Sequence, residues 1–505
     1  MSQLQSHPVS TVAVIGAGPV GLAAAAHLLE RALTPIVLEA GDGPADAVRQ
    51  WGHVRLFSPW RFDVDSAARR LLESHGWAAP DPDGLPTGAE LIDAYLAPLA
   101  RTPELSPHIR YGTKAVAVSR LGVDKTRTIG REGRPYLVRT RTTAGAWSDL
   151  IVDAVIDASG TWGRRNPLGA HGLAAPGEDH GAAWSVGPLP DVLGTERDRF
   201  AGKRTLVVGM GHSAANTLLN LAQLAEQEPE TAVAWAIRGD SPARLYGGGS
   251  ADALPARGTI GTRLRGLVES GAIELVAGFT IDRFEPGPGG SVSVVGEVGG
   301  VEHVIETDQV AAATGFRPDL EMLREIRLDL DSTVEAPSKL APLIDPNFHS
   351  CGTVPPHGEA DLAQPDEGFY LAGMKSYGRA PTFLLATGYE QVRSIAAALA
   401  GDREAADAVE LDLPETGVCS SSRSLDATSI AEAGEAGGCC GTAAGADSGS
   451  GCGTGETAAT GGCGTAAPEP VTIGSRGLAT GVLHGHSGER RELPQLKASG
   501  GGCCG

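Results

Sequence analysis

Two glycine-rich turns in this 505-residue sequence have the spacing of dinucleotide-binding fingerprints. The first turn follows the apolar run 12–15 and contains Gly16, Gly18 and Gly21, after which a helical pattern begins. In such a turn the first glycine permits the tight bend, the second lets the backbone approach a pyrophosphate, and the third lets the helix pack against the strand. Unpaired N–H groups at the start of the helix then face the phosphates. The pattern predicts a bound dinucleotide.

An acidic residue stands where such a site would hold a ribose. A second predicted strand, residues 34–38, ends in Glu39. The usual place of the acid that binds the ribose hydroxyls is about 20 residues beyond the glycines. We therefore expect Glu39 to belong to the first dinucleotide site.

The run 201–216 repeats this design. A predicted strand, 205–208, meets the glycine turn, and Ala214 takes the third position, where alanine still permits close helix packing. This run predicts a second dinucleotide site. The residues expected to contact its ligand are Gly209, Gly211, Ser213 and Ala214.

The second site carries a basic residue where an acid is more usual. The predicted strand 232–237 ends in Arg238, and an arginine there can pair with a 2′-phosphate, which favours NADPH over NADH. A plain surface charge is the alternative interpretation of Arg238. Arg244 and Arg257 are further candidates for phosphate contact.

Composition excludes several classes of protein. The net charge of −20 argues against a general nucleic-acid binder, because no basic stripe offsets the repulsion from phosphate. No apolar run is long enough to read as a membrane span, and the N-terminal residues lack a signal-peptide pattern. We expect a soluble, cytoplasmic protein that acts on a small molecule.

The C-terminal part of the sequence differs from the rest. From about Pro414, glycine, alanine, serine and threonine dominate and apolar periodicity ends, so we expect disorder. Cys351 stands alone in the body of the chain, and the other seven cysteines are Cys419, Cys439, Cys440, Cys452, Cys463, Cys503 and Cys504. The adjacent pairs, Cys439 with Cys440 and Cys503 with Cys504, could bind a thiophilic ion or form a strained disulfide. The alternative is that these thiols do little.

Several motifs together resemble the flavoproteins with two dinucleotide-binding domains. These are the two fingerprints in this order, the small-residue turns 158–160 and 313–315, and the strand-like run 368–373. The resemblance spans about residues 10 to 400. It implies FAD in the first site and NADPH in the second.

Two parts of the sequence narrow the resemblance. The segments 209–214 and 313–318 are similar to flavin-containing monooxygenases, and the segment 374–388 with the cysteine-rich tail resembles the monooxygenase-like proteins of bacterial arsenic-resistance clusters. The sequence departs from the monooxygenase pattern at 177–181, where Gly-Glu-Asp-His-Gly replaces Phe-x-Gly-x-x-x-His. It also departs from the disulfide reductases, because the first domain has no cysteine pair and Met374 replaces the aspartate of their Gly-Asp motif.

The resemblance implies an α/β fold with two Rossmann-like domains, the NADPH domain being inserted into a discontinuous FAD domain. The expected boundaries are residues 1–165 and 312–413 for the FAD domain, 166–311 for the NADPH domain and 414–505 for the tail. Gly373 and Thr382 are expected to contact FAD. A helix predicted to begin at Pro381 or Thr382 would direct its N-terminus at the flavin and stabilise negative charge there.

The expected reaction is hydride transfer from NADPH to FAD, followed by transfer of one oxygen atom from O₂ to a soft nucleophile. Two alternatives stay open: an NADPH-dependent thiol or metalloid reductase that uses the tail cysteines, and a non-catalytic NADPH sensor. No residue is assigned as an acid or base. The candidate hydrogen-bond donors near the flavin ring are His53, Arg55, Ser58, Lys375, Ser376, Tyr377 and Arg379.

Overall fold

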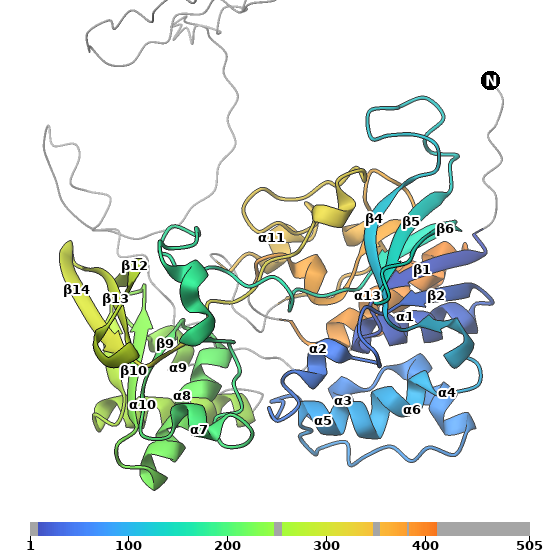
Figure 1. Ribbon diagram of the computed structural model, residues 1–505. Helices are drawn as coiled ribbons and strands as arrows, with labels where there is room; N and C mark the ends of the chain where they lie inside the picture. Colours follow the sequence, from blue (N-terminus) through green and yellow to red (C-terminus); the bar gives the residue numbers. More distant parts are fainter. Residues whose placement is uncertain (1–8, 247–254, 347–353, 381–382, 412–505) are drawn as a thin grey trace, which may run out of the picture. The chain divides into compact units, whose positions relative to one another are not determined.

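The computed structural model describes residues 9–246, 255–346, 354–380 and 383–411 (Figure 1). The chain divides into two units, Met1–Ala427 and Thr428–Gly505, and every described residue belongs to the first. In this part of the chain, no helix combines the length and the apolar composition that a membrane crossing requires.

A five-stranded parallel sheet carries the first glycine turn. The strand order is β16-β7-β1-β2-β3, and β1 lies in the middle, with Val14 opposite Val37 on one side and Ile156 on the other. A central parallel strand is covered on both faces, which is why its sequence is continuously apolar. The strands are β1 (Thr11–Ile15), β2 (Thr34–Leu38), β3 (Ile109–Arg110), β7 (Ala154–Asp157) and β16 (Phe369–Leu371).

Two long helices, α1 (Pro19–Glu30) and α13 (Leu385–Leu399), pack against each other beside this sheet (Figure 1). Helix α1 is buried from Val20 to Leu28, because its alanines and leucines leave it without a polar face. Helix α13 begins at Leu385, with the extended residue Leu384 as its N-cap, so the predicted start at Pro381 or Thr382 is wrong. Proline followed by threonine suits a helix start, but Phe383 and Leu384 are non-helical, and Pro381 and Thr382 themselves lie outside the described residues.

A second five-stranded parallel sheet carries the second glycine turn, in the order β11-β10-β9-β15-β8. Its strands are β8 (Ser185–Val186), β9 (Arg204–Val208), β10 (Ala232–Ile237), β11 (Glu274–Ala277) and β15 (Gln309–Ala312). Its helices are α7 (Arg197–Phe200), α8 (His212–Gln227), α9 (Ala243–Tyr246) and α10 (Pro255–Glu269). The predicted α/β class, with two parallel sheets of the Rossmann type, is confirmed.

Two three-stranded antiparallel sheets accompany the parallel ones. The alternating residues 111–152 form β4 (Thr113–Arg120), β5 (Tyr136–Thr142) and β6 (Trp147–Val152). The other sheet contains β12 (Phe279–Pro286), β13 (Val292–Val298) and β14 (Val301–Thr307).

A helical stretch over residues 88–100 consists of three pieces, α5 (Gly88–Leu91), a π-helical turn (Ile92–Leu96) and α6 (Ala97–Ala100). Thr87 and Glu90 form a capping box at its start. The remaining α-helices are α2 (Asp46–Arg49), α3 (Trp60–Asp63), α4 (Ser66–Ser74), α11 (Ala341–Ile344), α12 (Glu359–Leu362) and α14 (Arg403–Asp407). The 3₁₀ turns are Ser106–His108, Glu178–Ala183, Pro288–Gly290, Glu321–Leu323 and Gly373–Tyr377.

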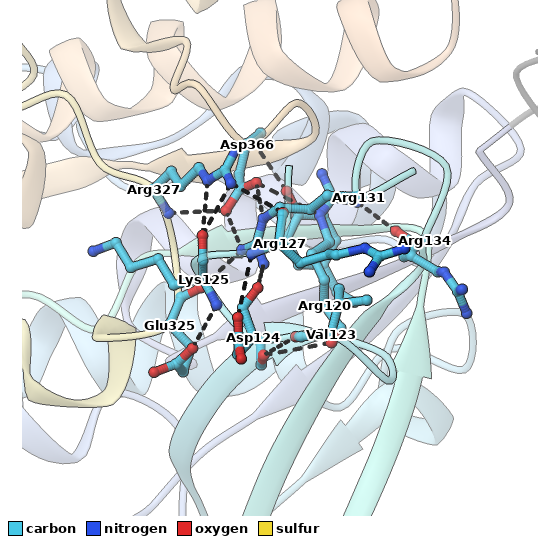
Figure 2. Close-up of polar contacts among 12 residues, drawn as sticks. Arg120, Val123, Asp124, Lys125, Arg127, Arg131, Arg134, Glu325, Arg327 and Asp366 are labelled. Carbon is cyan, nitrogen blue, oxygen red and sulfur yellow. Dashed lines mark hydrogen bonds and ion pairs between the residues drawn. The ribbon is translucent and has the colours of Figure 1, made fainter. Parts of the chain in front are cut away.

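A buried ion pair between Arg131 and Asp366 fastens the loop between β4 and β5 to the segment before β16 (Figure 2). The Arg131 guanidinium donates to both carboxylate oxygens, Nε at 2.9 Å and Nη2 at 2.7 Å. It also donates to the main-chain oxygens of Asp124 and Glu325. Burial would raise the pKa of Asp366, but the hydrogen bonds from Arg131 and from the Arg327 N–H outweigh it and hold the pKa below its usual value.

Candidate functional site

The three glycines of the first turn differ in what surrounds them. Gly16 has φ +100°, and a Cβ there would lie 2.9 Å from the carbonyl oxygen of Ala158. A Cβ on Gly21 would lie 1.9 Å from the carbonyl oxygen of Gly16. Gly18, the N-cap of α1, has no heavy atom within 4 Å of its missing Cβ. Close packing within the fold therefore explains why residues 16 and 21 are glycines, whereas Gly18 leaves the backbone open to a ligand.

The second turn repeats this geometry. Gly209 has φ +130°, and a Cβ there would lie 2.1 Å from the carbonyl oxygen of Ala313. Gly211, the N-cap of α8, has open space at the position of its missing Cβ. Ala214 is fully buried, so its side chain is packed at the contact between helix and strand, while Ser213 is half-buried near the helix start. Both turns fit the pyrophosphate of a dinucleotide.

Glu39 is fixed at the end of β2 that adjoins the first turn. The side chain is 9% exposed, and its Oε2 accepts a hydrogen bond from the Ala17 N–H at 2.8 Å. The other oxygen, Oε1, accepts from the Gly41 N–H at 2.8 Å. A carboxylate has about four acceptor positions, so both oxygens keep capacity for ribose hydroxyls. The role of Glu39 in binding ribose stays a prediction.

Arg238 lies at the end of β10 and is exposed. Among the described residues, its guanidinium donates one hydrogen bond, to the main-chain oxygen of Ala170 at 3.3 Å. Most of its donors therefore face solvent, where a 2′-phosphate could be bound. The side chains of Arg244 and Arg257 lie outside the described part of the structure.

The two small-residue turns lead into segments that are bonded to each other. Thr314 Oγ1 donates to the main-chain oxygen of Asn166 at 2.7 Å, and the Asn166 N–H donates to the carbonyl of Gly315 at 2.9 Å. The Asn166 amide also donates to the main-chain oxygen of Thr314 at 3.0 Å. These bonds tie residue 166, which follows the small-residue turn 158–160, to the small-residue turn 313–315.

A fully buried ion pair joins Lys375 to Asp157, the last residue of β7. Lys375 Nζ lies 2.6 Å from Asp157 Oδ2 and 3.1 Å from Ser159 Oγ. Ser159 Oγ in turn donates to Asp157 Oδ1 at 2.6 Å. The sequence predicted Lys375 as a hydrogen-bond donor to the flavin ring, whereas the structure directs at least two of its three N–H groups into the protein.

The turn that follows β16 is also held from within. The Gly373 N–H donates to Gln391 Oε1 at 2.8 Å, and Gln391 Nε2 contacts Ser376 Oγ and His357 Nε2, each at 2.9 Å. Ser376 donates to the Gly373 carbonyl, so its hydroxyl is engaged on both sides. Tyr377 is buried against Phe383 and His357. Ser376 and Tyr377, like Lys375, thus shape the turn.

The other predicted donors near the ring differ in exposure. His53, Arg55 and Arg379 are exposed, and Arg55 donates to the carbonyl of Leu85. Ser58 is buried and donates to Asp63 Oδ1 at 2.7 Å. Thr382, Cys351 and the tail cysteines, including Cys439, Cys440, Cys503 and Cys504, lie outside the described residues. Within the described ranges, no three His, Cys, Asp or Glu side chains are grouped as a metal site would need.

Sequence reasoning missed three buried polar residues: Asp63, Asp157 and Gln391. A weak signal existed for the two acids, because each follows or interrupts an apolar run, in Phe-Asp-Val and in Val-Ile-Asp. A charged residue in such a run is rarely buried without a partner. Gln391 had no signal, since a glutamine within a helix is ordinary.

No protein-family model matches the sequence. It is 28% identical over 219 residues to indole-3-pyruvate monooxygenase YUCCA6 of Arabidopsis thaliana, a match that covers 42% of this chain and 45% of that protein. The match thus spans less than half the length of this curated relative.

Several solved structures share the fold. Bacillithiol disulfide reductase Bdr (YpdA) of Bacillus cereus has a TM-score of 0.58 at 19% identity, covering 78% of this chain and 99% of that chain. DfoA of Erwinia amylovora, a cadaverine monooxygenase solved with FAD, has a TM-score of 0.55 at 13% identity, covering 81% and 99%. The fold is therefore that of the Rossmann-type oxidoreductases that use FAD and NAD(P).

Proposed function

We propose that this chain is an FAD-dependent oxidoreductase that takes a hydride from NADPH and uses O₂ to oxygenate a small, soft nucleophile. The observation that carries the proposal is the shared geometry of the two glycine turns. In each, the middle glycine caps a helix and leaves its backbone open, while the first glycine has no room for a side chain. Two such turns on two parallel sheets suit one enzyme with two dinucleotides.

The assignment of each ligand rests on the residues beside each turn. Glu39, at the first turn, has acceptor capacity for the ribose of FAD, and Arg238, at the second, has free donors for the 2′-phosphate of NADPH. Gly373, in the turn after β16, and Gly388, near the start of α13, both lie close to Val20, because a Cβ on either glycine would meet the Val20 side chain. The turn after β16 and the starts of α1 and α13 are therefore neighbours.

The protein's part in the reaction is binding and orientation, and FAD, when bound, supplies the redox chemistry. The N-termini of α1 and α8 offer backbone N–H groups and partial positive charge to the two pyrophosphates. Lys375 holds the turn after β16 against the end of β7. The start of α13 offers the same kind of partial positive charge to negative charge on the reduced ring.

The oxygenation step is supported by the relatives' names and by the resemblance of segments 209–214 and 313–318 to flavin-containing monooxygenases. YUCCA6 and DfoA are both named monooxygenases. A role in arsenic detoxification is the finer proposal. It rests on the likeness of segment 374–388 and the cysteine-rich tail to proteins of arsenic-resistance clusters.

The test uses the full chain with a panel of acceptors. The purified protein should be yellow and should bleach on addition of NADPH. Arsenite, organoarsenicals, thiols and amines are then compared for faster NADPH oxidation and for an oxygen atom in the product derived from ¹⁸O₂. A colourless protein that binds no FAD contradicts the proposal, and so does acceptor reduction without oxygen incorporation.

The same assay separates the alternatives. A thiol or metalloid reductase would lose turnover when the chain is truncated after Leu413, because its cysteine pairs are removed, whereas an oxygenase would keep its NADPH oxidation. A non-catalytic sensor would bind NADPH without oxidising it in the presence of any acceptor.

A further inference from the structure

Asp63, the last residue of α3, has a buried carboxyl group with one unused oxygen. The side chain is 0% exposed, and Oδ1 accepts the hydrogen bond from Ser58. Oδ2 is buried and has no hydrogen-bond partner among the described residues. Buried polar atoms are almost always paired, so such an exception indicates a missing ligand, water or functional proton.

Asp63 contacts helix α13, which packs on α1, the helix that begins at the first glycine turn. The Tyr389 hydroxyl, near the start of α13, donates to the main-chain oxygen of Asp63 at 2.8 Å. The residue before it, Gly388, packs so closely on α1 that a Cβ would come within 2.6 Å of Val20. Val20 follows Gly18 by two positions. Asp63 is therefore linked through α13 to the helix that begins at the first glycine turn, the proposed FAD site.

The groups around Asp63 do not neutralise its charge. Each carboxylate oxygen of Asp65 already has a partner, the Ala68 N–H at 2.8 Å and His27 Nε2 at 2.9 Å. The nearby phenols of Tyr95 and Tyr389 are buried, which raises the pKa of each and keeps it neutral. In the described part of the chain no arginine or lysine forms an ion pair with Asp63. Burial raises the pKa of Asp63 to about 7, and the Ser58 hydrogen bond opposes this only in part.

We propose that Asp63 is a proton-holding residue of the flavin site, whose free oxygen Oδ2 hydrogen-bonds to the bound flavin. Ser58 positions the carboxyl group by holding the other oxygen. The protonated group can donate to a flavin acceptor, and the ionised group can only accept. This inference rests on the proposed function and adds a proton equilibrium beside the flavin ring.

The experiment follows the absorbance spectrum of bound FAD across the neutral pH range in the full-length holoprotein. The wild type should show an inflection near pH 7, where Asp63 titrates. Asp63→Asn, which keeps the shape and the Ser58 contact, should abolish the inflection. Ser58→Ala should move it to higher pH, because the hydrogen bond that favours the ionised form is lost.

The matched control is Asp65→Asn, which alters a buried carboxylate two positions away whose two oxygens each have a partner. Its inflection should match that of the wild type. Thermal unfolding checks that each variant is folded, and Asp63→Asn should be at least as stable as the wild type at mildly alkaline pH because it removes a buried charge.

An inflection that persists in Asp63→Asn, or that is absent from the wild type, overturns the inference. If FAD is bound and NADPH is oxidised in that experiment, the proposed function stands and only the role of Asp63 fails. A protein that binds no FAD overturns the proposed function itself, and this inference with it.

Discussion

Lys375 and Asp157 form an ion pair of 2.6 Å between two strand ends of the same sheet, although 218 residues separate them in the sequence. Both side chains are at most 1% exposed. The pair connects the turn after β16 to the end of β7, two neighbouring strands. Because two buried charges compensate each other here, the turn that we assign to the flavin site depends on both.

Replacing one partner of the Lys375–Asp157 pair should lower the free energy of unfolding more than replacing both partners. Lys375→Met leaves a buried, unpaired carboxylate, and we expect the free energy of unfolding to fall by about 3 kcal/mol. The double variant Lys375→Met/Asp157→Asn should recover most of this loss. Urea denaturation measures both. The exposed pair of Arg139 and Asp149 is the control, and Arg139→Met should leave stability nearly unchanged. Equal losses in the single and double variants would contradict the argument.

Substitution of two glycines in the first glycine turn should affect FAD binding in one case and folding in the other. Gly18→Ala should fold normally, because its Cβ meets no heavy atom, but should hold less FAD per protein. Gly21→Ala places a Cβ 1.9 Å from a carbonyl oxygen and should not give soluble, folded protein. Circular dichroism and the ratio of flavin to protein provide the measurements. Full FAD occupancy and unchanged affinity in Gly18→Ala would refute the assignment of this turn.

Arg238 should set the preference between NADPH and NADH. Charge-assisted hydrogen bonds contribute about 1.5–3 kcal/mol, so Arg238→Ala should raise the KM for NADPH by roughly tenfold or more. The KM for NADH should change little, because NADH lacks the 2′-phosphate. Arg283→Ala, which removes an exposed arginine paired with Glu285, is the control. Equal effects on both coenzymes would assign Arg238 a structural role.

Asp63 should make stability fall as the pH rises. Its pKa is raised from 3.8 to about 7 in the folded protein, so between these values the folded state holds a proton that the unfolded chain has released. The free energy of unfolding should therefore decrease across this window, by about 4 kcal/mol in total. Asp63→Asn should remove that decrease. The difference between wild type and variant, measured by denaturation at several pH values, isolates this one group.

The Arg131–Asp366 pair should control the loop between β4 and β5. Asp366→Ala removes the acceptor for two guanidinium N–H groups and for the Arg327 N–H, so we expect a loss of about 3 kcal/mol. Limited proteolysis should then cut within residues 121–135 before it cuts elsewhere in the described ranges. A variant that is less stable but is cleaved at the wild-type sites would show that the pair does not hold this loop.

Local sequence patterns predicted the elements that short-range physics determines. The glycine turns were recognisable because the needs of a tight bend, an open backbone and a close helix contact act on residues a few positions apart. The alternation in residues 111–152, which form an antiparallel sheet, is a pattern of the same short range. The start of α13 was predicted wrongly from a local Pro-Thr signal, although the helix begins only at Leu385.

The sequence by itself therefore determined the two glycine turns with the strand before and the helix after each, since each such unit is encoded within one continuous segment. The tertiary structure alone decided which charges are buried together. Lys375 meets Asp157 only because β16 lies next to β7, and Asp63 is buried where α13 packs against α3. Burial and charge pairing depend on strand order and helix packing, which no local pattern records.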